Sequence, residues 1–167
     1  GVQTCCLPIC FCARPYPLLA DSGWIDFPAS VWGGRLKCMS GPWYAETGAY
    51  QVDPEYLKSG HGWDLDFGGT TGVLVPVEVG VLPKFGAAQL PGDYKLGAYY
   101  DTSDAPDLFK DIHGGPAALI GGLRRVRDGR DGGYVMAQQQ ITERSAGSKQ
   151  GITLCTNATL SDRKSAL

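Results

Sequence analysis

The stretch VLVPVEVGV (Val73–Val81) decides the fold class. Valine fills every second position, and the positions between them hold Leu74, Pro76, Glu78 and Gly80. Because successive side chains of a strand point to opposite faces, one face of this strand is all valine and the other carries a carboxylate. A row of valines facing lipid, with Glu78 facing a polar lumen, explains the pattern. A sandwich strand whose valines lie in a dry core would show the same alternation.

Pro76 stands in the middle of this strand. A proline cannot donate its backbone nitrogen to a neighbouring strand, so it removes one hydrogen bond from the ladder. We therefore expect a bulge or a local break in the pairing at Pro76.

Five more strand-like stretches surround Val73–Val81, and their connections are alternately short and long. The stretches are Ser30–Met39, Trp43–Val52, Gly92–Tyr100, Gly133–Ile141 and Gly151–Ser161. Residues 40–42, 82–91 and 142–150 form short turns, whereas 53–72 and 101–132 form long segments. Short turns on one rim and long loops on the other are typical of outer-membrane barrels. Each stretch also has about the 9–11 residues that a tilted strand needs to cross a bilayer.

Aromatic residues gather at the ends of these stretches, as in the two interfacial belts of membrane proteins. They are Trp32, Trp43, Tyr50, Tyr94, Tyr99, Tyr100 and Tyr134. No apolar run approaches the roughly 20 residues of a transmembrane helix. The 24 glycines among 167 residues suit an all-β protein with many turns. A formal net charge of -2 gives no indication of nucleic acid as a partner.

The cysteines are unevenly distributed, with four of the six in the first twelve residues. Their spacing lacks the paired pattern of common zinc sites, so a disulfide in an oxidising compartment is the favoured interpretation, and no metal or cofactor is expected. Glu46 and Glu78 can also be read as the carboxylate pair of a glycosidase. Nothing in the sequence fixes their separation, and we expect no enzyme.

Taken together, these segments resemble the carbohydrate-selective porins of bacterial outer membranes, the OprB-type family. The matching stretches are FPASVWGGRL (Phe27–Leu36), GAYQVDP (Gly48–Pro54), GTTGVLVPVEVG (Gly69–Gly80), LPGDYKLGAYYDTSDAPDLF (Leu90–Phe109) and NATLSDR (Asn157–Arg163). The resemblance implies an all-β, antiparallel transmembrane barrel of about sixteen strands. It also implies passive diffusion of sugars, glucose-like ones especially, across the outer membrane.

The resemblance further implies that this chain is an internal part of a longer protein, with about six of the strands. Residues 1–29 would form an extracellular-side loop with the cysteine cluster, and residues 30–167 a partial barrel. The family pattern suggests Cys12 as one partner of a disulfide, and Cys5 or Cys6 as the other. Sugars and outer-membrane lipid are the expected partners, with a monomer or a homotrimer as the assembly. The polypeptide alone is expected neither to fold stably nor to conduct.

A pore that favours sugar needs donors and acceptors that replace the hydration of hydroxyl groups. Arginine and lysine supply only donors, and carboxylates supply only acceptors. By strand parity, the expected lumen residues are Arg35, Lys37, Glu46, Glu78, Lys95 and Tyr99. The loop candidates are Asp101, Asp104, Arg124, Arg125 and Arg127.

A soluble, lectin-like β-sandwich that binds carbohydrate is the alternative. Its strands would also alternate, and its loops would also carry aromatic and acidic residues. The face that holds the valines separates the two hypotheses, because a lectin points them inward and a porin points them outward.

Overall fold

A computed structural model describes residues 31–57, 67–117, 123–145, 147–148 and 150–162. The elements in these residues are β1 (Gly33–Ser40), β2 (Trp43–Val52), η1 (Pro54–Leu57), β3 (Gly72–Val81), β4 (Lys84–Phe85), β5 (Leu90–Asp101), β6 (Ala105–Asp111), β7 (Arg124–Arg127), β8 (Arg130–Gln140) and β9 (Thr153–Ser161). No helix in these residues is long and apolar enough to cross a membrane.

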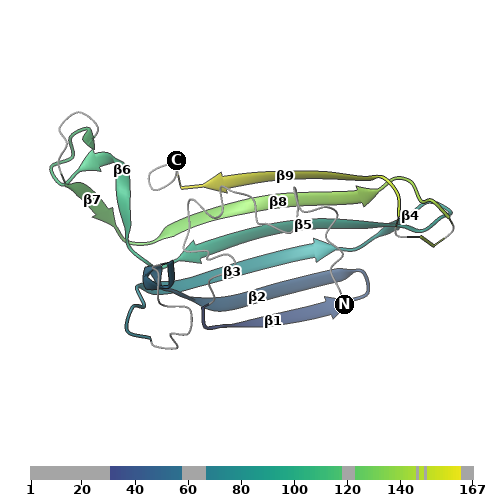
Figure 1. Ribbon diagram of the computed structural model, residues 1–167, viewed down its shortest axis with the longest axis horizontal. Helices are drawn as coiled ribbons and strands as arrows, with labels where there is room; N and C mark the ends of the chain where they lie inside the picture. The colour runs from purple at the N-terminus through teal and green to yellow at the C-terminus, as the bar shows by residue number, and fades with distance from the viewer. Residues whose placement is uncertain (1–30, 58–66, 118–122, 146, 149, 163–167) are drawn as a thin grey trace.

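Six long strands form one antiparallel sheet in the order β1-β2-β3-β5-β8-β9 (Figure 1). The short β4 pairs with the beginning of β5, and β6 and β7 form a separate two-stranded sheet. The sequence predicted all six long strands, and the observed ends lie within three residues of the expected ones. The all-β, antiparallel fold class is therefore confirmed.

The expectation of one long loop over residues 101–132 is wrong. The segment contains β6 and β7, and β8 already begins at Arg130. The four residues of β7 are Arg-Arg-Val-Arg, which gives no apolar alternation by which a strand can be recognised. Figure 1 shows the β6–β7 hairpin standing apart from the large sheet, at the end where the long connections lie.

Residues that pair directly across the sheet share one face. One such row runs through Lys37, Glu46, Glu78, Gly97, Tyr134 and Thr159. We call the face with this row the polar face. The neighbouring row of Val77, Ala98, Gly133 and Leu160 lies on the opposite face, which we call the valine face.

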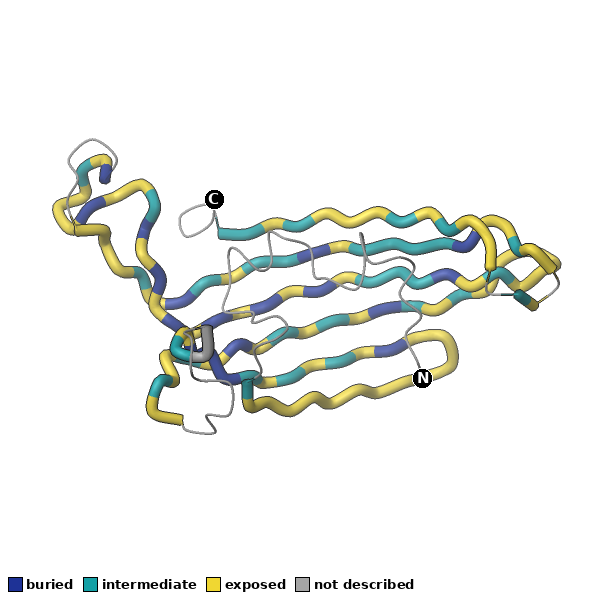
Figure 2. The backbone as a smooth tube through the Cα atoms, in the orientation of Figure 1, coloured by how far each residue is buried: buried dark blue, intermediate teal, exposed yellow. Residues whose placement is uncertain are grey.

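The two faces differ in burial. On the valine face, Val77, Leu96 and Val135 are each about half exposed. The buried cluster includes Leu74 and Tyr99, and it lies on the polar face. Figure 2 shows this alternation of buried and exposed residues along the strands. A sandwich with its valines in a dry core would show the reverse. An apolar face of this extent in contact with water is rare in soluble proteins, so the sheet fits contact with lipid.

Pro76 produces the expected break, and the break is not a bulge. The pairing between β2 and β3 stops after Thr47↔Val77 and resumes at Tyr50↔Leu74 in the same register. The hydroxyl of Thr47 donates to the Pro76 carbonyl at 2.9 Å within this gap. On the other side of β3, the pairing of Pro76 with Tyr99 continues without interruption. The proline therefore interrupts one ladder only.

Glycines on the polar face provide room for tyrosines on adjacent strands. Tyr44 is paired with Gly80, and Tyr134 is paired with Gly97. A Cβ atom at either glycine would collide with the ring of its tyrosine. The missing side chain thus lets each ring lie across the neighbouring strand. This arrangement explains in part why the sequence is rich in both glycine and tyrosine.

Aromatic contacts mark both ends of the sheet. Trp32 stacks on Phe67 at the end with the long connections, with ring centroids 6.0 Å apart. At the end with the short turns, Phe85 meets Tyr94 edge to face at 6.3 Å. These positions agree with the two interfacial belts expected from the sequence.

Candidate functional site

Glu78 is at the centre of the polar face and receives a hydrogen bond from each side. The Tyr44 hydroxyl, on β2, donates to Oε1 at 2.7 Å. The Tyr134 hydroxyl, on β8, donates to Oε2 at 2.6 Å after crossing over Gly97 of β5. Both carboxylate oxygens are thus engaged, and the interaction joins β2, β3 and β8 across the intervening β5.

Lys95 lies beside this cluster, on β5. Its Nζ atom is 4.0 Å from Glu78 Oε1 and 3.5 Å from Asp93 Oδ2. The lysine side chain is 22% exposed, and the Glu78 side chain is 13% exposed. Lys95 therefore connects two carboxylates of the polar face and keeps only part of its surface open.

Arg35 and Lys37 form the more open part of the polar face, on β1. Both approach Glu46 Oε2, Lys37 at 3.2 Å and Arg35 at 3.7 Å. The Lys37 ammonium also lies 3.8 Å from the centre of the Tyr44 ring, within range of a cation–π interaction. The Arg35 side chain is 60% exposed, so its guanidinium is the most accessible of the cations on this face that form ion pairs.

A buried ion pair closes the polar face at the end with the long connections. Asp101 is fully buried, and Arg130 Nη2 donates to its Oδ2 at 2.7 Å. The other carboxylate oxygen accepts from the backbone N–H and the hydroxyl of Ser103. Since β6 begins only two residues after Ser103, this cluster anchors the base of the hairpin.

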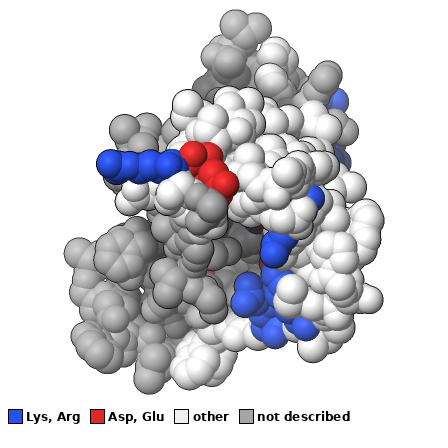
Figure 3. Space-filling view, turned by 90° about the vertical axis from the view of Figure 1, so that its right-hand side faces the viewer, with Lys and Arg blue, Asp and Glu red and all other residues white. Residues whose placement is uncertain are grey.

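The charges on the polar face of the six strands are balanced. The cations are Arg35, Lys37, Lys95 and Arg130, and the anions are Glu46, Glu78, Asp93 and Asp101. Every one of them takes part in an ion pair. Figure 3 views the molecule from the end with the short turns, and charged side chains appear there as small groups on a mostly uncharged surface. Among the described residues, no group of three or more His, Cys, Asp or Glu side chains could hold a metal ion.

Asp101 is thus a loop candidate that lies on the polar face, whereas the other four loop candidates lie on or beside the hairpin. Asp104 is exposed just before β6, and Arg124 and Arg125 are exposed on β7. Arg127 approaches Asp107 at 3.8 Å across the hairpin. The backbone N–H of Phe109 holds the pKa of Asp107 below its ordinary value; the N–H of Lys110 and the charge of Arg127 add to this effect, against the opposing effect of desolvation.

The strand candidates thus lie together, although Tyr99 among them and the loop candidate Asp101 are deeply buried. Arg35, Lys37, Glu46, Glu78 and Lys95 form one connected set on the polar face. Tyr99 is 2% exposed, and Asp101 is completely covered. Cys5, Cys6 and Cys12 lie outside the described residues, as does the whole segment 1–29, so the disulfide and the domain boundary stay predictions.

The hydrogen bonds and ion pairs of the polar face form a network, and four of its residues were not among the candidates predicted from the sequence: Tyr44, Asp93, Arg130 and Tyr134. Asp93 and Tyr44 share strand faces with Lys95 and Glu46, so parity alone could have found them. Tyr134 and Arg130 could have been found only with the register between β5 and β8.

A family model described as carbohydrate-selective porin, OprB family, matches residues 3–167. The chain belongs to the OprB family of carbohydrate-selective porins. A relative named Porin B, from Pseudomonas aeruginosa, is 39% identical over 156 residues, which are 93% of this chain and 34% of the relative. The protein named Putative porin QuiX, from Acinetobacter baylyi, is 30% identical over 149 residues, 86% of this chain and 31% of that protein.

The sheet also resembles a solved OprB structure. The high-pH structure of Pseudomonas putida OprB superposes with a TM-score of 0.79 at 34% sequence identity, over 86% of this chain and 34% of that one. The chain spans about a third of the length of the curated relatives it matches. The described sheet therefore corresponds to part of an OprB barrel.

Family membership decides several questions that the sequence left open. It places the chain in the bacterial outer membrane and in a family of porins. The expectation that the chain is not an enzyme agrees with this family, whereas the roles of Glu46 and Glu78 stay predictions. The lectin-like sandwich is excluded by the same match, and the exposed valine face agrees with the exclusion.

Proposed function

We propose that this chain forms part of the wall of an outer-membrane channel, along which neutral sugars pass by diffusion. The solutes would be monosaccharides or small oligosaccharides, glucose-like ones especially. The valine face would contact outer-membrane lipid, and the polar face would contact water and solute. Assembly as a monomer or a homotrimer stays a prediction.

The balanced charge of the polar face is the observation that carries this proposal. Channels that select ions do so with rings of one charge sign. Here each cation of the polar face is within ion-pair distance of a carboxylate. Such a wall offers hydrogen-bond donors and acceptors at close spacing without a net field that would favour either ion. That combination suits a neutral solute with many hydroxyl groups.

The accessible members of the network are the best candidates for solute contact. Arg35 and Lys37 keep 60% and 34% of their side-chain surface exposed, and both lie within ion-pair distance of Glu46. The ring of Tyr44 is buried beneath the Lys37 ammonium, so the donors of Arg35 and Lys37 are the groups open to a sugar hydroxyl. Glu78, Tyr99 and Asp101 are too covered for direct contact, and we assign them the role of holding the wall in place.

The experiment is single-channel conductance in planar bilayers, with the protein produced from the complete gene that carries this sequence. Stepwise conductance that falls on addition of glucose is the expected result. The Arg35→Ala substitution removes one hydrogen-bond donor, so the glucose concentration for half block should rise by about threefold to tenfold.

Leu36→Ala is the matched control, because Leu36 lies next to Arg35 on the opposite face and is exposed. It should leave the glucose effect unchanged. Conductance without any glucose effect would contradict the sugar specificity but not the channel. Failure of the folded protein to conduct would contradict the channel itself.

A further inference from the structure

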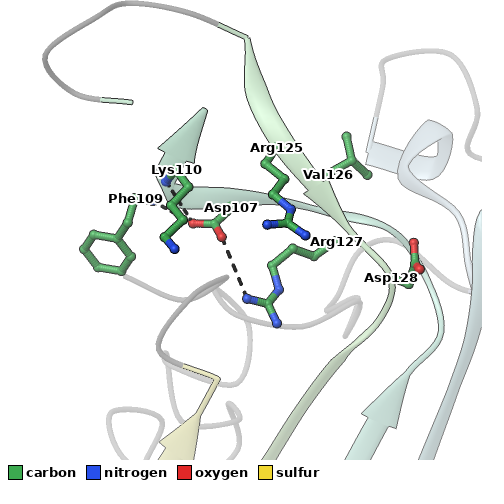
Figure 4. Close-up of a pocket in the computed structure, with 7 residues that line it drawn as sticks. All are labelled: Asp107, Phe109, Lys110, Arg125, Val126, Arg127 and Asp128. Atoms are coloured by element: carbon green, nitrogen blue, oxygen red, sulfur yellow. Dashed lines mark hydrogen bonds and ion pairs between the residues drawn. The ribbon is translucent and has the colours of Figure 1, made fainter. Parts of the chain in front are cut away.

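We propose a second binding site, for an oxyanion, on the β6–β7 hairpin. Arg125 and Arg127 of β7 and Lys110 of β6 surround an open pocket of about 640 Å³ (Figure 4). Phosphate and carboxylate are the anionic groups that such a pocket would take. The site is separate from the polar face and does not depend on sugar passage.

The strand pairing explains why these cations converge. Ala105 pairs with Arg127, and Pro106 pairs with Val126. Continuing this register would set Arg125 opposite Asp107, so Arg125 and Arg127 lie on the same side of β7 as Asp107. A register shift follows between Pro106 and Asp111. Lys110 lies in this shifted segment and lines the same pocket.

The pocket holds more cationic groups than its central carboxylate can neutralise. Asp107 Oδ1 accepts the backbone N–H groups of Phe109 at 2.9 Å and Lys110 at 3.1 Å. Asp107 Oδ2 is 3.8 Å from Arg127 Nη1. Asp128 is the second lining carboxylate, and Figure 4 places it beyond Arg127, at the far edge of the pocket.

Arg125 and the Lys110 ammonium are therefore the groups available to a ligand. Within the described residues, no carboxylate lies within ion-pair distance of either side chain. Both residues are exposed, in contrast to the paired cations Lys95 and Arg130 of the polar face. Figure 4 shows the guanidinium and the ammonium facing the same hollow, with Asp107 between them but outside ion-pair distance of either.

The residue types point to the chemistry of the ligand. A guanidinium presents a planar fork of donors that matches two oxygens of a phosphate or a carboxylate, and an ammonium adds a point charge. Phe109 and Val126 line the same pocket and are 61% exposed each, so apolar surface is available beside the anionic group. Two sources share this chemistry: a free solute that carries an oxyanion, and a phosphate-bearing lipid headgroup.

The first arm of the test measures binding of inorganic phosphate and of gluconate by isothermal titration calorimetry. The protein is produced from the complete gene, in a neutral detergent at low salt, with glucose as the uncharged reference. Arg125→Ala should weaken binding by about tenfold, the effect of one hydrogen bond to a charged group. Arg124→Ala should leave it unchanged, because Arg124 does not line the pocket. Arg125→Lys should recover part of the affinity.

The second arm measures retention of the same proteins on phosphatidylcholine vesicles with and without lipid A. Retention that requires lipid A and falls with Arg125→Ala but not with Arg124→Ala would identify the headgroup as the source. The same dependence on Arg125 in the first arm alone would identify a free solute. Absence of any dependence on Arg125 in both arms, or an equal loss with Arg124→Ala, would overturn the proposal.

Discussion

The polar face and the β6–β7 hairpin carry similar residue types but treat their charges differently. On the polar face, Glu78 engages both oxygens with tyrosine hydroxyls, and Asp101 is completely enclosed by its partners. On the hairpin, one oxygen of Asp107 accepts hydrogen bonds from backbone N–H groups, and the Arg125 side chain stays exposed.

This contrast indicates which charges stabilise the structure and which are open to a ligand. A buried charge is tolerated only with partners of good geometry, so the enclosed pairs of the sheet are structural first. An exposed cation beside a pocket costs little to leave unpaired, because water screens it. Arginines that look alike in the sequence therefore have different roles, and the exposure of each guanidinium separates them: the Arg130 side chain is 17% exposed, that of Arg127 is 32% exposed, and Arg125 is exposed without an ion pair to a described carboxylate.

The largest expected effect comes from breaking the most enclosed pair. Asp101→Ala would leave Arg130, whose side chain is 17% exposed, without its carboxylate. Loss of one partner of a buried pair costs about 3–5 kcal/mol of unfolding free energy. The measurement is urea unfolding of the folded protein in detergent.

Asp104→Ala is the control for this substitution, because Asp104 is exposed three residues further along the chain. Its effect should stay within about 0.5 kcal/mol. Equal effects of the two substitutions would show that enclosure of Asp101 does not stabilise the wall.

A smaller effect is expected at the centre of the polar face. Glu78→Gln replaces one of the two acceptor oxygens by a donor, so one tyrosine hydroxyl loses its partner, at a cost of about 2 kcal/mol. Glu46→Gln should cost no more than about 1 kcal/mol, because its partners Arg35 and Lys37 are much more exposed. Urea unfolding measures the loss of unfolding free energy in the two variants. A larger loss for Glu46→Gln than for Glu78→Gln would contradict the assignment of Glu78 as the structural carboxylate.

The smallest effect is a pH dependence of the hairpin. The pKa of Asp107 in the folded chain lies below the ordinary value of 3.8, so the Asp107 carboxylate stabilises the hairpin fully at pH values above 3.8. This contribution should disappear as the pH falls from 3.8 through the lower folded-state value. Hydrogen exchange at the Phe109 and Lys110 amides, corrected for intrinsic rates, measures it. Protection that stays constant through this range, or that still varies with pH in Asp107→Asn, would contradict the account.

Strand parity was enough to predict the two faces of the sheet. The valines of β3 alternate without exception, so Glu78 could be placed on the face opposite to them from the sequence alone. The same argument placed Arg35, Lys37 and Lys95 on the face of Glu78, and the pairing agrees. That these side chains contact a solute stays a prediction, because the contacts seen in this structure are among the side chains themselves.

Partners across strands required the register, which local patterns do not contain. Tyr134 reaches Glu78 only because Gly97 lies between them, and a glycine in a strand has several possible meanings. The hairpin was missed because β7 is almost entirely arginine and because an Asp107 side chain, rather than apolar alternation, organises the turn in β6.

We infer that the polar face lines water and the valine face contacts lipid. Single cysteines in a cysteine-free background test this assignment, with a charged, water-soluble thiol reagent applied to the protein in liposomes. We expect fast labelling at Lys37→Cys, Lys95→Cys and Met136→Cys, which lie on the polar face. We expect little labelling at the adjacent valine-face positions Leu36→Cys, Leu96→Cys and Val135→Cys. Equal labelling of both sets, or faster labelling of the valine face, would contradict it.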